Sequence, residues 1–288
     1  MRSNFMQVRS VGAQAALILM GGEAAQALPT CTSPEEVVLA DAAALTRGDG
    51  QQRMALFRED GRVFVLPTDP DRLVGELSSR LGTQKQRRVA FLEPATLDPP
   101  DVTEVVEMTA LKDLVFAKYK ITDGRDPAHI NYLLVVFRIV ECGIAALWHV
   151  AQTLTDDPVA VVQSEGVIRE LVAANNAGQV ERFLAVFAPS VSLFRSSDDP
   201  HAIGDRPSKY NGDAEGRRQV FLQMFAKGAP ADVEILDMIT VGDLVVSRDV
   251  ATLPNGRIVD GVSIYRIREG RITHDWYVSE QPRDQAQP

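Results

Sequence analysis

The fold of this chain is decided by residues 138–150, RIVECGIAALWHV, which recur further along as residues 266–278, RIREGRITHDWYV. Six of the thirteen aligned positions are identical, whereas ordinary composition gives roughly one identity by chance. The two tryptophans of the chain, Trp148 and Trp276, fall on each other. A match of this kind indicates a duplicated structural unit.

The same register continues towards the N-terminus with small slips. Residues 113–115 and 243–245 both read Asp-Leu-Val, and Gly48 and Phe57 face Gly178 and Phe187. Order and spacing are therefore kept across the repeat. We place the first unit at residues 34–153, the second at 158–282 and a disordered tail at 283–288.

Within each unit, apolar residues at helical spacing are followed by a run of alternating strands bounded by Gly, Asp and Asn turn signals. Helices followed by antiparallel strands predict an α+β fold in which the helices pack on one face of a curved antiparallel sheet. The predicted helices are 37–47, 51–57 and 72–81 in the first unit and 159–177, 180–187 and 214–226 in the second. The predicted strands are 62–66, 102–108, 114–121, 132–139 and 144–152, then 191–195, 233–239, 244–253, 259–266 and 271–280.

This order of elements, ending in Gly270-Arg271-Ile272 and Trp276, resembles the nuclear-transport-factor-2-like superfamily, and its SnoaL-like branch in particular. Arg248 and Asp249 fit the pattern of the same branch. The resemblance covers most of residues 158–282 and, more faintly, residues 34–153. It implies two tandem cone-shaped domains with the second pocket retained and the first degenerate. It does not choose among isomerases, cyclases, dehydratases and non-catalytic binders.

The N-terminal segment has the features of an export signal. Arg2 and Arg9 precede the apolar run 11–20, and the small residues Ala25 and Ala27 follow it. We expect a signal peptide at residues 1–27 and a bacterial protein exported to the periplasm or secreted. Outside it, no segment is long enough to form a stable membrane span.

The cysteines, Cys31 and Cys142, are each expected as a lone thiol. A disulfide between them is an open alternative in an oxidising compartment, and lipidation of Cys31 is another. No motif indicates a metal site or a cofactor. The net charge of −9 argues against a nucleic-acid partner, because a phosphate backbone favours basic surfaces.

For the site, the alternation of side chains along a strand assigns Ile272, His274, Trp276 and Val278 to the interior of the second cone. Asp275 and Tyr277, like His149, are then expected to face a neighbouring sheet. His274 is a polar residue on an apolar face and Asp249 a carboxylate in an apolar pocket, so both are candidate acid–base residues. The ligand-binding candidates are Trp276, Arg248, Tyr210, Phe187 and Phe221.

The sequence is compatible with three functions. In the first, the second domain binds a small apolar or amphipathic molecule without transforming it. In the second, it is a cofactor-free isomerase, cyclase or dehydratase that uses His274 and Asp249. In the third, the sheets form a protein-interaction scaffold. Pairing of the two units predicts a monomeric pseudo-dimer, with a homodimer as the alternative.

Overall fold

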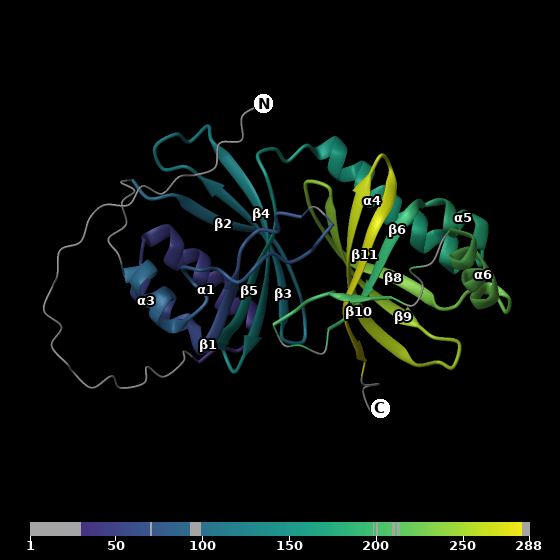
Figure 1. Ribbon diagram of the computed structural model, residues 1–288, viewed down its shortest axis with the longest axis horizontal. Coiled ribbons are helices and arrows are strands. Elements are labelled where there is room, and N and C mark those ends of the chain that lie inside the picture. Colours follow the sequence, from purple (N-terminus) through teal and green to yellow (C-terminus); the bar gives the residue numbers. More distant parts are fainter. Residues whose placement is uncertain are drawn as a thin grey trace, which may run out of the picture.

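The structure is a computed structural model that describes residues 30–69, 71–92, 99–197, 199, 201–208, 211 and 214–283. The expected signal peptide, almost all of the expected tail and the candidate ligand residue Tyr210 lie outside these ranges. Two α+β units lie side by side along the long axis (Figure 1). None of the described helices is long and apolar enough to cross a membrane.

The first unit places its helices ahead of most of its strands, as predicted. Its five strands form one sheet in the order β1-β5-β4-β3-β2, with β1 parallel to β5 and the other pairs antiparallel. Its elements are α1 (Pro34–Arg47), α2 (Gly50–Leu56), β1 (Phe57–Phe64), α3 (Gln84–Leu92), β2 (Val102–Leu111), β3 (Leu114–Thr122), β4 (Ile130–Val140) and β5 (Gly143–Thr153).

The second unit repeats this topology. Its sheet runs β7-β6-β11-β10-β9-β8, and again the first long strand, β6, is parallel to the last, β11. Its elements are α4 (Pro158–Asn176), α5 (Val180–Ala185), β6 (Phe187–Arg195), β7 (Arg206–Pro207), α6 (Ala214–Phe225), β8 (Asp232–Val241), β9 (Leu244–Thr252), β10 (Ile258–Arg268) and β11 (Arg271–Pro282). The α+β fold class with two tandem cones is confirmed.

The third helix of the first unit was predicted in the wrong place. Residues 72–81 are turns and an isolated bridge between Phe64 and Leu77, and the helix α3 begins at Gln84. Backbone groups of the predicted span bond to the end of β1 instead, since Val65 N–H donates to Glu76 O and Ser78 N–H to Val63 O. Strand-like pairing has therefore taken one backbone carbonyl and one N–H group that a helix would need.

A buried arginine marks the true equivalence of α3 and α6. Arg87 of α3 donates to the backbone carbonyls of Arg58 and Glu59 at 3.0 and 3.1 Å. Arg217 of α6 donates to the backbone carbonyl of Pro189 at 2.7 Å. Each arginine thus holds its helix against the first strand of its own unit.

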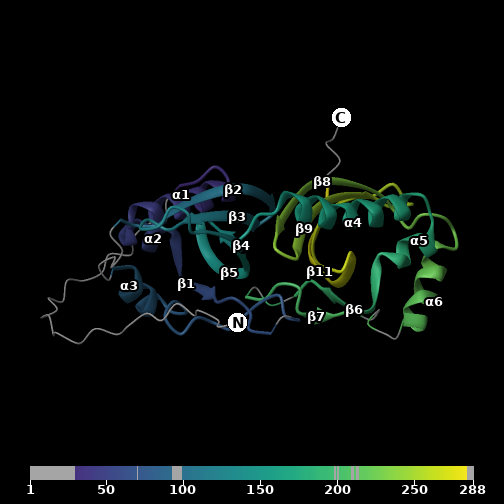
Figure 2. The ribbon, with the colours of Figure 1, turned by 90° about the horizontal axis from the view of Figure 1, so that it is seen from above.

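The two sheets pack face to face (Figure 2). One apolar cluster joins them and contains Phe116, Val136 and Trp148 of the first unit with Val246 and Trp276 of the second. This packing is an intramolecular pseudo-dimer. The outer faces of the two sheets are thus packed against each other, whereas a protein-interaction scaffold would need these faces to bind a partner.

Both tryptophans therefore face the partner unit, and the prediction that they face the pocket is wrong. The cause is a β-bulge near the start of each last strand. His274 pairs with Arg266 but Ile272 pairs with Ile267, which leaves Thr273 as the extra residue. The first unit has the same bulge at Ala145. A one-residue slip moves every later side chain to the opposite face.

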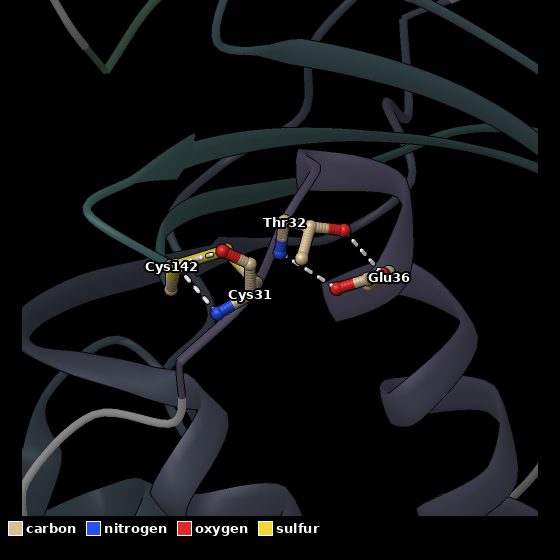
Figure 3. The surroundings of a disulfide bond; sticks show 4 residues. All are labelled: Cys31, Thr32, Glu36 and Cys142. Atoms are coloured by element: carbon tan, nitrogen blue, oxygen red, sulfur yellow. Dashed lines mark hydrogen bonds between the residues drawn. A yellow bond between two sulfur atoms is a disulfide. The ribbon is translucent and has the colours of Figure 1, made fainter.

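A disulfide joins Cys31, ahead of α1, to Cys142 in the turn between β4 and β5 (Figure 3). The expectation of two lone thiols is wrong. The cysteines are 111 residues apart in sequence, so their proximity depends on the tertiary fold and not on any local pattern. The bond fixes the start of the first unit to its sheet.

Candidate functional site

The structure places His274 between the two units. Its Nε2 lies 3.5 Å from Asp71 Oδ1 of the first unit, and its ring stacks on Trp276 with the ring centres 5.0 Å apart. Burial, and then the nearby Arg266 guanidinium, lower the pKa of the imidazole. His274 is therefore a largely neutral interface residue, on the face of β11 that packs against the first unit.

Trp276 and Arg248 also lie on this outer face. Trp276 is 1% exposed within the cluster that joins the sheets. The Arg248 guanidinium lies 3.8 Å from Asp237 and 4.0 Å from Asp260. Neither side chain reaches the concave side of the second sheet.

Phe187 and Phe221 lie on the helix side of the sheet. They belong to an aromatic group in which the Phe183 ring is 5.4 Å from Phe187, 5.1 Å from Phe221 and 5.2 Å from Phe225. This aromatic packing holds α5 and α6 onto the first strand of the unit, so both residues support the cone wall.

Asp249 lies on the concave face, which is where the acid–base hypothesis needs it. The Ser247 hydroxyl donates to its Oδ1 at 2.6 Å. Burial raises the pKa of the Asp249 carboxyl to about 6, against the effect of this hydrogen bond. Its neighbour across the sheet is Gly261, where a side chain would come within 3.6 Å of the Tyr277 ring and hydroxyl.

The bulge brings a second carboxyl, Asp275, to the same face. Burial, and then the charge of Asp249, raise its pKa to about 7. Its Oδ1 is buried and has no hydrogen-bond partner among the described residues. Asp275 was expected on the opposite face, and only knowledge of the bulge at Thr273 could have corrected this.

Two tyrosines complete what we call the carboxyl cluster, which consists of Asp249, Asp275, Tyr265 and Tyr277. Burial raises the pKa of both phenols well above the ordinary value, so they stay neutral. The Tyr277 hydroxyl donates to Glu280 at 2.7 Å. Asp249, Asp275 and Tyr277 remain partly exposed, as side chains lining a concave surface do.

The chemistry of the cluster follows from these values. Two carboxyls with pKa values of about 6 and 7 both change protonation near neutral pH, and Asp275 does so in the field of the Asp249 charge. One of them can then donate a hydrogen bond while the other accepts. The surrounding wall is apolar and includes Ile168, Leu171 and Val245. His274 and Asp249 do not act together, because they lie on opposite faces of the sheet.

Comparison with known proteins gives one family match. A family model described as a SnoaL-like domain matches residues 168–275. A search of curated proteins returned no match.

Several solved structures are similar to part of the chain. One is wild-type IdmH, a candidate polyketide cyclase from Streptomyces antibioticus, with 26% identity over 42% of this chain and 91% of its own, at a TM-score of 0.31. A cystatin-fold protein from Novosphingobium aromaticivorans has 20% identity over 40% of this chain and 97% of its own, at a TM-score of 0.33. An NTF2-like protein of unknown function from Mesorhizobium loti has 18% identity over 43% and 96%, also at 0.33.

Proposed function

We propose that the second unit, a SnoaL-like domain of the nuclear-transport-factor-2-like fold, binds a small amphipathic molecule against its carboxyl cluster. The apolar part of the molecule packs on the inner wall of the cone. Its polar group bonds to Asp249 and Asp275. The binding leaves the molecule unchanged.

The observation that carries this proposal is the pair of carboxyls on the concave face. Withdrawing a carboxyl even partly from water costs free energy unless a cation or hydrogen bonds offset the loss of hydration. Among the described residues, Asp249 has one hydroxyl donor and Asp275 Oδ1 has no partner. Such a pair does not serve packing, so a ligand that supplies the missing hydrogen bonds explains it.

A second candidate function uses the same residues for proton transfer. Carboxyl pKa values of about 6 and 7 lie close to neutral pH, where a general base and a general acid work best. In an isomerisation, the Asp249 carboxylate would take a proton from carbon next to a carbonyl and return it elsewhere. Protonated Asp275 would donate a hydrogen bond to the carbonyl oxygen meanwhile. Asp275 then replaces His274 in the pair.

We also propose that the chain is exported. The disulfide between Cys31 and Cys142 supports this, because such bonds persist in oxidising compartments and are rare in the cytosol. Cys31 follows the expected cleavage point closely. N-terminal sequencing of the protein from its own host is expected to read from Leu28, and an intact Met1 in a reduced cytosolic protein would contradict export.

Native mass spectrometry of the protein from its own host tests binding. We expect a co-purified small molecule in the wild type that is lost in Asp249→Asn/Asp275→Asn. Asp232→Asn, which changes an exposed carboxyl of β8, is the matched control and should retain the molecule. A molecule that stays bound in the double variant would contradict the proposed site. Returning the released molecule to catalytic amounts of protein, with product analysis, separates binding from turnover.

A further inference from the structure

A cavity of about 310 Å³ lies inside the first unit, between its helices and the concave face of its sheet. This volume is at the lower end of the range of ~300–1,000 Å³ for small-molecule sites. Much of the wall is apolar and is formed by Leu45, Leu81, Ile121, Leu133, Val135 and Leu147. Polar side chains also line it, which an inert packing defect would lack.

The central polar group is an ion pair contributed by the helices. Asp41 of α1 is 1% exposed, and Arg53 of α2 donates from its Nε to Asp41 Oδ1 at 2.8 Å. The Arg53 guanidinium also lies 4.5 Å from the centre of the Phe91 ring. Asp41 Oδ2 is buried and has no hydrogen-bond partner among the described residues. The pair is therefore anchored, with one acceptor atom unused.

Two neutral polar groups come from the sheet. Burial, and then the Arg53 charge, lower the pKa of His149 to about 4, so the imidazole is uncharged at neutral pH. Burial, and then the charge of the adjacent Asp41, raise the pKa of Tyr119 well above its ordinary value, and the hydroxyl donates to the Val38 carbonyl at 3.4 Å. Asp101 also lines the cavity and accepts from the Gly124 N–H at 3.1 Å.

These charges select the class of ligand. The ion pair has no net charge, and the carboxylates of Asp41 and Asp101 disfavour an anion. A cation would compete with Arg53 for Asp41. A neutral ligand with a hydroxyl group avoids both penalties and can donate to Asp41 Oδ2, which is a charge-assisted hydrogen bond.

We propose that the first unit holds its own binding site, in which a neutral, mainly apolar molecule donates a hydroxyl hydrogen bond to Asp41. The site is separate from the carboxyl cluster of the second unit and does not depend on it. Tyr119 and His149 line the sheet side of the cavity, next to the ion pair, and position the molecule. The first unit, whose pocket was expected to be degenerate, is then a second ligand-binding domain.

The second unit shows which residues would close this cavity. Counted from Gly48 and Gly178, which follow α1 and α4, Asp41 corresponds to Leu171. By the same count, Arg53 corresponds to Phe183. Both Leu171 and Phe183 pack in the apolar core of the second unit. Asp41→Leu/Arg53→Phe therefore replaces the ion pair with residues that the same fold already accommodates.

Calorimetric titration of the full chain at pH 7 with three naphthalene probes tests the site. We expect 2-naphthol, a neutral donor, to bind with one equivalent that survives in Asp249→Asn/Asp275→Asn. Its methyl ether, which lacks the donor, should bind at least about tenfold more weakly, since a hydrogen bond to a charged group contributes ~1.5–3 kcal/mol. The anion 2-naphthoate should bind more weakly still.

Two variants should remove this equivalent by different routes. Asp41→Leu/Arg53→Phe removes the acceptor, and Leu133→Trp fills the cavity from the sheet while leaving the ion pair in place. Melting curves and near-ultraviolet circular dichroism identify which variants are folded. The proposal is overturned if wild type does not bind 2-naphthol, if the ether or the naphthoate binds equally well, or if a folded cavity variant keeps the equivalent. The probe comparison in wild type needs no variant.

Discussion

The two units share one topology but take their buried charged or titrating groups from opposite walls. In the first unit the charged groups come from the helices, as Asp41 and Arg53, and the sheet offers Tyr119 and Leu147. In the second unit the helix positions hold Leu171 and Phe183, and the carboxyls come from the sheet.

The pairing registers establish this exchange. Tyr119 pairs with Leu133 as Asp249 pairs with Gly261, and Leu147 pairs with Phe137 as Asp275 pairs with Tyr265. Asp249 and Asp275 therefore occupy the places of Tyr119 and Leu147. The two units keep the same apolar framework, but the charged or titrating side chains lie on the helices in the first unit and on the sheet in the second. The polar residues of one interior therefore cannot be predicted from those of the other.

The largest expected effect concerns the disulfide, because only the first unit has one and Gly270 aligns with Cys142. Removal of a native disulfide typically lowers the free energy of unfolding by about 2–5 kcal/mol. We expect Cys142→Ser to lower the melting temperature and to lose hydrogen-exchange protection first in α1. Equal loss of protection in α1 and α4 would show that the two units unfold as one.

Asp275→Leu introduces into the second unit the leucine found at the equivalent position, Leu147, of the first. The raised pKa means that the native state holds a proton between about pH 4 and pH 7 that the unfolded chain has lost. Stability from this group is therefore present at acidic pH and is lost as the pH rises through about 7. We expect the variant to gain on the order of 3 kcal/mol at pH 8, measured by urea unfolding. Asp232→Leu should show no such gain.

His149→Tyr introduces into the first unit the tyrosine found at the aligned position, Tyr277, of the second. The pH dependence of stability has the opposite sign to that of Asp275. His149 stays neutral in the native state down to about pH 4, whereas the free imidazole binds a proton below 6.5. Wild type therefore loses stability as the pH falls through this range. The variant should abolish on the order of 2 kcal/mol of this loss. An unchanged acid transition would show that the ring is already accessible to water.

The smallest expected effect is that of Ser247→Ala. The hydroxyl donates to Asp249 and lowers the pKa of its carboxyl. Its removal should raise that pKa further above 6 and cost about 1 kcal/mol of stability. Carbon-13 detected titration measures the pKa of Asp249, and urea unfolding measures the stability. A carboxyl pKa that falls in the variant would mean that Ser247 is not its donor.

The sequence predicted the duplication and most elements because their signals are local or repeated. The helix that ends at Gly48 and the turn at Glu269 and Gly270 lie where predicted, and Gly48 and Gly270 have the positive φ that such positions favour. The face of the last strand was not predictable in the same way. Side chains alternate between the two faces only where the strand has no bulge, and the residue type at Thr273 does not indicate one.

The candidate site was predicted in part for the same reason. Asp249 lies on the concave face, where the acid–base hypothesis needs it, because β9 itself has no extra residue and the bulge opposite Asp249, at Leu236, lies in β8. The bulge at Thr273 reverses the faces that strict alternation assigns to His274 and Asp275. This one error excluded Asp275 from the predicted site and included His274. The disulfide and the cavity of the first unit depend on contacts between distant segments, which a single sequence does not contain.

The second unit is distinguished by two titrating carboxyls on the concave face of its sheet, with His274 on the opposite face. Carbon-13 detected pH titration of chain labelled at the aspartate carboxyls measures this directly, with Asp249→Asn and Asp275→Asn as assignments. We expect two resonances that titrate near pH 6 and pH 7 and that are unchanged in His274→Ala. Carboxyls that both titrate near their ordinary value of 3.8, or that both shift when His274 is removed, would contradict it.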